Sequence, residues 1–250
     1  MTSEQLLSPA YEGPRIPATR FKEYKREQAG ISRRMLYPVT TFYTCYSLIM
    51  MIVAGRTKHA FVAVAFYLVG APIWTFIEYL SHRYVLHGRY KPGKGLPRKL
   101  LVKYINPLHW EHHDHPFDGE HINGELKDLL PMFAVFAPLS FIFPVYTAPM
   151  LLAGVCQCYV LEEWVHHSVH FYNFRNRYFK YIRKHHIYHH TSTGMKLGYG
   201  FTSAIWDVVF KTRYSAAVRE RLYGGKKRSG VASQIRPAAA ANTASQTLQS

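Results

Sequence analysis

Long apolar runs alternate along this chain with polar segments that carry most of its histidines. Between Leu36 and Ile77 the only charged side chains are Arg56 and Lys58, which divide the stretch into two runs. Each run is close to the roughly 20 residues that an α-helix needs to cross a bilayer. Neither shows the polar face that a helix on the surface of a soluble protein carries. The pattern therefore predicts two transmembrane helices, over residues 36–54 and 60–80.

A third apolar region, residues 129–161, contains no charged residue. At about 1.5 Å per residue, one helix of that length would reach roughly 50 Å, well beyond the roughly 30 Å hydrocarbon core of a bilayer. The region is interrupted by Pro138, Pro144 and Pro149. Because proline ends or kinks helices, we expect a hairpin of two spans, residues 129–145 and 148–163, with its turn near Val145 to Pro149.

Four crossings would place both chain ends on the same side of the membrane, and the basic residues indicate which side. Lysines and arginines are frequent before the first span and after the second, whereas the turn between these spans has only Arg56 and Lys58. Cytoplasmic segments carry such an excess of positive charge. The predicted fold is therefore an all-α integral membrane bundle of about four transmembrane helices, with a cytosolic, helical, histidine-rich domain at one end.

Three regions follow from this topology. Residues 1–35 form a cytosolic segment without the apolar stretch of a cleavable signal peptide. Residues 36–222 form the membrane-embedded domain. Residues 223–250 are rich in Ala, Ser, Thr and Gln, and because this composition cannot bury a core, we expect a disordered tail.

The formal net charge of +16 raises the possibility of a nucleic-acid partner. Membrane orientation accounts for much of the same charge, because juxtamembrane Lys and Arg interact with anionic headgroups. We therefore expect no nucleic acid to bind. The three cysteines, Cys45, Cys156 and Cys158, lie inside apolar runs and indicate neither a disulfide framework nor a zinc finger.

The chain has 15 histidines, and all but His59 lie between His82 and His190. Ten of them form four groups: His82 and His87; His109, His112 and His113; His166 and His170; His186, His189 and His190. Residues three and four apart share one face of an α-helix, so each HxxHH block can direct three imidazoles to one place. His82 and His87, five apart, diverge by roughly 140° on an α-helix and are expected to reach two different metals.

Ten imidazoles exceed the four to six ligands that one ion takes, so two metal ions fit the pattern better. A single HxxHH block is equally consistent with a solvated helix face. Two such blocks together with two pairs, all next to apolar segments, favour a metal centre at the cytosolic end of the bundle. The five remaining histidines are expected to be surface residues or partners of ligands, with His167 and His185 as alternative ligands.

Ligand type alone leaves the metal open, because imidazole suits iron, zinc, copper and nickel. A metal site at the end of a lipid-embedded bundle can admit an acyl chain or a sterol. Oxidation of such C–H bonds requires a redox metal or an organic cofactor, and no GxGxxG fingerprint of a flavin or nicotinamide site is present. A metal-binding or metal-transport protein is the alternative of another class. Transport sites usually lie near the bilayer midplane, whereas these ten histidines lie outside the apolar runs.

Three segments resemble the fatty acid hydroxylase family of membrane di-metal oxygenases: Glu78–His87, His112–Asp118 and Gly200–Thr212. The five-residue histidine spacing and the ending Trp-Asp-x-x-Phe-x-Thr are most similar to fatty acyl (ceramide) 2-hydroxylases. The resemblance covers roughly Glu78 to Thr212.

The resemblance implies a di-iron centre held by the ten histidines and O₂-dependent hydroxylation of a membrane lipid, at the carbon next to an acyl carbonyl. Sterol oxidation or desaturation on the same scaffold is the alternative. No His-Pro-Gly-Gly haem motif is present, so we expect an external electron donor such as cytochrome b5 and its reductase. In a eukaryote we expect an endoplasmic reticulum protein with its active site on the cytosolic face. Glu78, Glu162 and Glu163 are expected either to orient imidazoles or to be helix-end charges at headgroup level.

Overall fold

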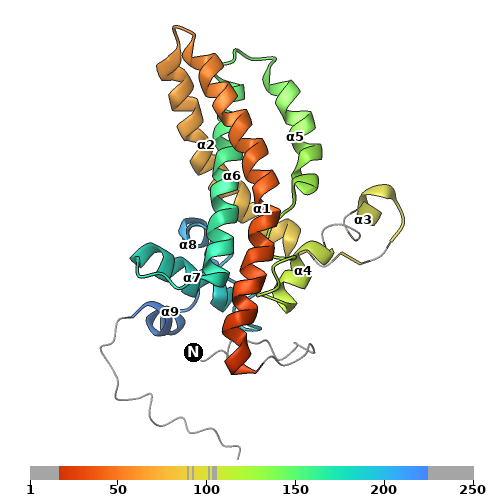
Figure 1. Ribbon diagram of the computed structural model, residues 1–250, viewed down its shortest axis with the longest axis vertical. Coiled ribbons are helices and arrows are strands. Elements are labelled where there is room, and N and C mark those ends of the chain that lie inside the picture. The colour runs from red at the N-terminus through yellow and green to blue at the C-terminus, as the bar shows by residue number, and fades with distance from the viewer. Residues whose placement is uncertain (1–16, 89, 92, 101, 103–105, 225–250) are drawn as a thin grey trace, which may run out of the picture. The chain divides into compact units, whose positions relative to one another are not determined.

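The structure is a computed structural model that describes residues 17–224, apart from 89, 92, 101 and 103–105. Most of the predicted tail, from residue 225 onward, and the first 16 residues of the predicted N-terminal segment lie outside the described residues. Helices and loops make up the described part of the chain, as the all-α prediction requires (Figure 1). The elements are α1 (Ala18–Gly55), α2 (Ala60–Leu80), the π-helical turn η2 (Ser81–Leu86), α3 (Leu96–Leu100), α4 (Asn106–Asp114), α5 (Leu126–Ser140), α6 (Ala148–Phe171), α7 (Arg177–His189), α8 (Ile205–Val209) and α9 (Ala216–Tyr223).

The chain divides into two compact units after Tyr214. The first unit contains α1 to α8. In the second, α9 begins after Ser215, whose hydroxyl accepts a hydrogen bond from the backbone N–H of Val218. This is the ordinary way in which serine caps a helix.

Helix α6 is central to the first unit, because it packs along both α1 and α2 (Figure 1). Its contact with α1 includes a hydrogen bond from the Ser47 hydroxyl to the Ala153 carbonyl, 3.0 Å long. Helix α1 has 38 residues, about 57 Å at 1.5 Å per residue. Its N-terminal half continues past the expected span, and there Ala29 packs with Ile122 and Phe171 at the histidine-rich end.

The predicted hairpin is present as α5 and α6, but its first helix ends earlier than expected. Helix α5 ends at Ser140, and residues 141–147 form the turn. Pro144 lacks the backbone N–H that would bond to the carbonyl of Ser140 in a continued helix, and its ring would clash with that carbonyl. Helix α6 continues beyond the expected residue 163, as far as Phe171, and so carries His166 and His170 of the ten patterned histidines.

Two of the described helices, Thr19–Gly55 and Ala60–Leu86, are long and apolar enough to cross a membrane. Only 28% and 11% of their most apolar windows are buried inside the protein. Large apolar side chains are instead exposed on α1, α2 and α5, among them Ile52, Phe61, Leu68 and Phe136. Soluble monomers rarely expose so much contiguous apolar surface. This surface fits lipid, whereas the full count of four spans stays a prediction, since α5 with 15 residues reaches only about 22 Å.

Helices α2 and α6 approach each other at two glycines. A Cβ on Gly154 would lie 2.0 Å from the carbonyl oxygen of Tyr67, and a Cβ on Gly70 would lie 2.6 Å from the backbone of Gly154. Small residues permit this approach, which is how helices commonly pack in membranes. Alanines and methionines fill the neighbouring core: Met50, Ala54, Ala63, Met150 and Ala153.

We expect Gly154→Ala to lower the thermal unfolding midpoint of the purified protein in detergent, because the added methyl group must push α2 and α6 apart. Overpacking of this kind costs about 1–3 kcal/mol. Gly55→Ala is the matched control, since no atom lies within 4 Å of a Cβ built there. Equal midpoints for the two variants would contradict the close approach.

Candidate metal centre

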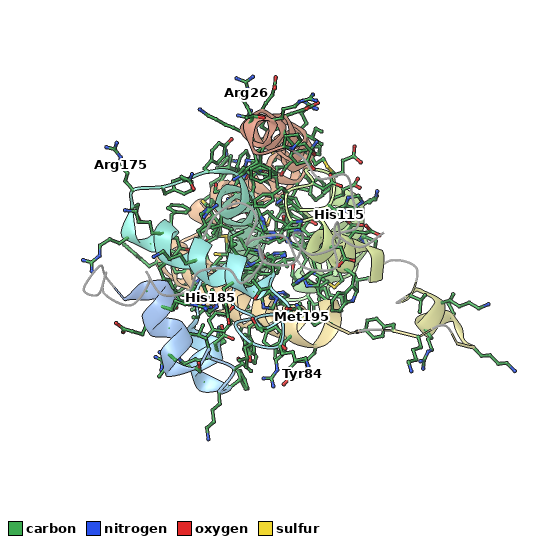
Figure 2. The ribbon with its side chains drawn as sticks, turned by 90° about the horizontal axis from the view of Figure 1, so that it is seen from below. Arg26, Tyr84, His115, Arg175, His185 and Met195 are labelled. Atoms are coloured by element: carbon green, nitrogen blue, oxygen red, sulfur yellow. The ribbon has the colours of Figure 1, made fainter. Side chains whose placement is uncertain are left out.

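Four parts of the chain bring the ten patterned histidines to one end of the helical bundle. His82 lies in η2 and His87 directly after it. The other eight histidines lie on α4, at the end of α6, and on α7 and its C-cap residue. Nine of the ten are buried, and His87 is half-buried. In Figure 2, which views this end of the protein, the labelled His115 lies beside α4 and His185 on α7; neither belongs to the ten.

The ligand nitrogens form two groups of five, and within each group all lie within 4.8 Å of one another. The first histidine group is His82, His87, His109, His113 and His189. The second histidine group is His112, His166, His170, His186 and His190. The expectation that each HxxHH block directs three imidazoles to one place is therefore wrong. Within each block the residues four apart share a group, whereas neighbours such as His112 and His113 differ by about 100° around the helix and reach different groups.

His82 and His87 belong to the same group, so the expectation that they reach two different metals is also wrong. The reason is η2: the backbone N–H of His87 donates to the carbonyl of His82, five residues earlier, at 3.1 Å. This i→i+5 hydrogen bond is that of a π-helix, a turn often found at functional sites. It widens the turn and brings the two Nε2 atoms to 3.2 Å from each other.

The second group has the chemistry of a metal site. The Nε2 atom of His186 lies 3.0 Å from that of His166, 2.8 Å from that of His170 and 3.0 Å from that of His190. A neutral imidazole has one donor and one acceptor nitrogen, so hydrogen bonds between these rings cannot satisfy all the converging Nε2 atoms. A cation at their centre can accept a lone pair from each of them.

Burial keeps these imidazoles neutral. Desolvation, followed by the proximity of other histidines, lowers the pKa of His112, His186 and His190 well below its ordinary value. The same burial, with His87 nearby, lowers the pKa of His189 to about 3. Neutral imidazole is the form that binds metals, so both groups offer lone pairs at neutral pH.

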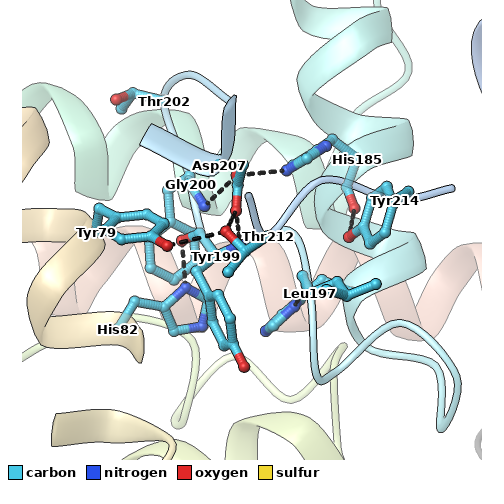
Figure 3. A network of polar contacts seen from close by, with 12 residues as sticks. Tyr79, His82, His185, Leu197, Tyr199, Gly200, Thr202, Asp207, Thr212 and Tyr214 are labelled. Carbon is cyan, nitrogen blue, oxygen red and sulfur yellow. Dashed lines mark hydrogen bonds and ion pairs between the residues drawn. The ribbon is translucent and has the colours of Figure 1, made fainter. Parts of the chain in front are cut away.

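A loop between α7 and α8 orients two rings of the first group. The Nδ1 atom of His82 lies 2.5 Å from the carbonyl oxygen of Tyr199, and that of His189 lies 2.7 Å from the carbonyl oxygen of Leu197. A carbonyl oxygen can only accept, so each Nδ1 carries the proton and each Nε2 keeps its lone pair. Figure 3 shows this loop and the carboxylate of Asp207 that holds it.

The three glutamates are buried, so they are not charges at headgroup level. Glu78 accepts hydrogen bonds from the backbone N–H groups of Phe201 and Thr202 and from the Thr202 hydroxyl. This places the Phe201 ring in a stack on His82, with centroids 4.3 Å apart. Glu78 therefore acts on the imidazoles through a loop rather than by the expected direct hydrogen bond.

Glu163 and Glu162 also accept hydrogen bonds from neighbouring parts of the chain, and none of the hydrogen bonds described for them comes from the ten histidines. Glu163 accepts from the side chain of Asn123 at 2.8 Å and from the backbone of Gly124, which holds the loop after α4 against α6. Glu162 accepts a hydrogen bond from the indole N–H of Trp74, at 3.1 Å.

Two histidines outside the pattern have other partners, so neither is an alternative ligand. The Nδ1 atom of His167 lies 2.8 Å from the hydroxyl of Ser32 on α1. The Nε2 atom of His185 lies 3.4 Å from a carboxylate oxygen of Asp207. Sequence reasoning missed Asp207 as a functional residue. The only signal was its place in the Trp-Asp-x-x-Phe-x-Thr segment.

An apolar cavity of about 410 Å³ lies between α2, α5 and α6, with Phe136 and Phe143 among its lining residues. A smaller cavity of about 190 Å³ reaches His109 of the first group and His112 and His166 of the second. The two cavities share five lining residues: Trp74, Ile77, Leu129, Met132 and Tyr159. The two cavities are therefore neighbours, with the side chains of these five residues between them.

The lowered histidine pKa values predict that the metal-free protein loses stability in acid. Unfolded histidines have a pKa of about 6.5 and take up protons below that value, while the buried ones remain neutral until far lower pH, so falling pH favours unfolding. We expect a lower thermal midpoint at about pH 5.5 than at about pH 7.5 for protein treated with a chelator.

The double variant His112→Gln/His186→Gln should show a smaller difference between the two midpoints, because two of the titrating groups are gone. His115→Gln, at a half-exposed side chain, should leave the difference unchanged. A double variant with the same pH-dependent difference as the wild type would contradict the burial of neutral imidazoles, because the buried glutamates contribute equally to both proteins.

Fold and site together define the class: a helical membrane protein with a histidine-rich centre suited to two metal ions. A sequence model of the fatty acid hydroxylase family matches residues 67–212, more than half of the chain. The chain belongs to the fatty acid hydroxylase family, a family of oxidoreductases, as the resemblance predicted.

Named relatives agree with this assignment. The dihydroceramide fatty acyl 2-hydroxylase FAH2 of Arabidopsis thaliana is 30% identical over 209 residues, which cover 80% of each chain. The fatty acid 2-hydroxylase of Rattus norvegicus is 31% identical over 155 residues, 60% of this chain and 40% of the rat protein. A solved structure described as full-length scs7p, with only the hydroxylase domain visible, has a TM-score of 0.63 at 27% identity, and the match covers 72% of this chain and 67% of that one.

Proposed function

We propose that this protein is an O₂-dependent lipid monooxygenase that hydroxylates fatty acyl chains at the carbon next to the carbonyl. The observation that carries the proposal is a pair of neighbouring cavities, of which the larger is apolar and the smaller reaches both histidine groups. The relatives named as fatty acid and fatty acyl 2-hydroxylases support the position of the reaction. In the overall reaction, one C–H bond, O₂, two electrons and two protons give one C–OH group and water.

Two iron ions are the proposed cofactor, one held by each histidine group. Five neutral nitrogen donors per group suit iron in ligand type and number. When bound, the metals supply the redox chemistry that oxidation of an unactivated C–H bond requires. The ligands would be the ten patterned histidines.

The residues of this chain bind and orient the substrate. The walls of the larger cavity, including Phe133 and Leu152, are apolar and suit a hydrocarbon chain. At the junction of the cavities, Leu129 and Trp74 direct the chain towards the metal centre. The Phe201 ring, packed on His82 and His166, covers the imidazoles and helps to exclude water, which favours selective oxidation.

Membrane placement and electron supply complete the proposal. The distribution of lysine and arginine supports four spans with the histidines on the cytosolic face, in the endoplasmic reticulum membrane of a eukaryotic cell. Electrons come from a separate donor of the cytochrome b5 type and its reductase. The exposed apolar helices support a substrate that enters from the lipid.

The reaction is tested by supplying ¹⁸O₂ to cells that express the protein together with a cytochrome b5 and its reductase, followed by mass spectrometry of the lipids. We expect one ¹⁸O atom in 2-hydroxy acyl lipids. Labelled sterols would instead indicate sterol oxidation, and unsaturated lipids without label would indicate desaturation; either result would contradict the acyl hydroxylase proposal. His112→Gln and His113→Gln should each abolish labelling, because they remove one ligand from different groups.

The path through the cavities is tested at its junction. Leu129→Trp fills the space shared by the two cavities, and we expect it to lower 2-hydroxy lipid formation by at least about tenfold, as steric exclusion from an apolar pocket does. Leu130→Trp makes the same change at the next residue of α5, which is 38% exposed and lines neither cavity. Product formation that falls equally in both variants would contradict the path.

A further inference from the structure

The carboxylate of Asp207, on α8, is fully buried and organises the loop before it (Figure 3). Its Oδ1 atom accepts hydrogen bonds from the backbone N–H of Tyr199 at 2.9 Å and from the hydroxyl of Thr212 at 2.7 Å. Its Oδ2 atom accepts from the backbone N–H of Gly200 at 3.1 Å and pairs with His185 at 3.4 Å. Three hydrogen-bond donors therefore surround one carboxylate, and the His185 ring lies beside it.

These donors keep Asp207 ionised. Burial raises the pKa of its carboxyl, but hydrogen bonds from His185 and Thr212 outweigh that effect, and the pKa lies below its ordinary value. The Thr212 hydroxyl in turn accepts from Tyr79 at 2.9 Å, so the network reaches α2. A charged acceptor that receives hydrogen bonds from both Tyr199 and Gly200 holds this part of the loop in one conformation.

The loop that Asp207 holds provides the two carbonyls that orient the first histidine group. The Tyr199 residue whose N–H is bound by Asp207 directs its own carbonyl to His82. Two residues earlier, the Leu197 carbonyl binds His189. Gly198 lies between them at a φ of 68°, a left-handed conformation that favours glycine, and its N–H donates to the Thr212 carbonyl.

Among the described residues, no hydrogen bond joins this loop to a ring of the second group; its hydrogen bonds to imidazole rings go to His82 and His189. The Nδ1 atoms of His112 and His170 in the second group are buried without a hydrogen-bond partner in the described part of the chain, as is that of His113 in the first group. Hydrogen bonds to the remote nitrogen fix the tautomer and orientation of a metal-bound imidazole and raise its basicity. The two groups therefore differ in how their rings are held.

We propose that Asp207 is a positioning residue for the metal of the first histidine group alone. It acts through the loop: the carboxylate holds the N–H groups of Tyr199 and Gly200, the carbonyls of this loop hold the Nδ1–H groups of His82 and His189, and the two Nε2 lone pairs face the metal. This inference rests on the proposed function, because it assumes that both groups bind iron.

Asp207→Asn tests the inference, because an amide has only one acceptor oxygen and turns its NH₂ towards donors. The measurement is iron bound per chain of purified full-length protein, equilibrated anaerobically with a series of Fe²⁺ concentrations. We expect the wild type to bind two ions. In the variant one ion should bind about 10- to 100-fold more weakly, the usual effect of removing a group that orients a metal ligand, and the other should bind unchanged.

Two further backgrounds show which ion is affected. His189→Gln removes a ligand of the first group, so the tightly bound ion that remains is that of the second group, and adding Asp207→Asn should not weaken it. His186→Gln removes a ligand of the second group, so adding Asp207→Asn should weaken the remaining ion. Asp118→Asn is the matched control: this carboxylate binds the N–H of Glu120 and pairs with His121, and its variant should keep two ions.

Thr212→Val keeps the inference testable if Asp207→Asn does not fold. It removes one donor to Asp207, so it should weaken the same ion to a smaller extent, and Thr212→Ser should restore binding because it keeps the hydroxyl. A wild type that binds fewer than two ions would contradict the proposed function itself. If the wild type binds two ions and the folded variants weaken the binding of both ions or of neither, only the role of Asp207 is contradicted.

Discussion

The convergence of ten imidazoles, nine of them buried, is the constraint on which the rest of this structure depends. Their Nε2 atoms approach to about hydrogen-bonding distance, and because a neutral imidazole has only one donor nitrogen, hydrogen bonds between the rings cannot satisfy all of these atoms. A buried polar atom without a partner costs about 1–3 kcal/mol, so the arrangement needs a scaffold that resists opening, and each group offers a site where a cation would offset that cost. The scaffold is visible in the parts that surround the histidines.

Buried carboxylates supply much of that resistance. Glu78, Glu163 and Asp207 each accept hydrogen bonds from backbone N–H groups of a loop that lies beside the imidazoles. None of the hydrogen bonds described for Glu78 or Glu163 goes to a ring of the two groups. Loops that would otherwise be the least ordered parts of the site are thus fixed to helices, and the helices are fixed to one another by the close approach of α2 and α6 at Gly70 and Gly154.

The helical scaffold also connects the metal centre to lipid. Helix α6 packs on α1 and α2 in the apolar part, borders the larger cavity, and ends with His166 and His170 in the second group. One continuous helix therefore relates the position of the cavity to that of the second histidine group. In the proposed reaction, this shared element would set the distance from an acyl carbon to the histidine groups, so that a flexible hydrocarbon chain is oxidised at one position.

The amino-acid sequence alone determined the all-helical class, the apolar helices, the ten histidines and the family, because helix periodicity, hydropathy and motif spacing are local properties. It predicted wrongly how the histidines divide. An ideal α-helix separates His82 from His87, and only the π-helical turn, stabilised by its surroundings, brings them together. Each HxxHH block divides between groups whose other members come from distant parts of the chain. Asp207 holds a loop whose carbonyl binds His82, which lies 117 residues before Tyr199. These were decided by the tertiary structure, because backbone carbonyls leave no signal in a sequence and side-chain direction depends on which helices pack together.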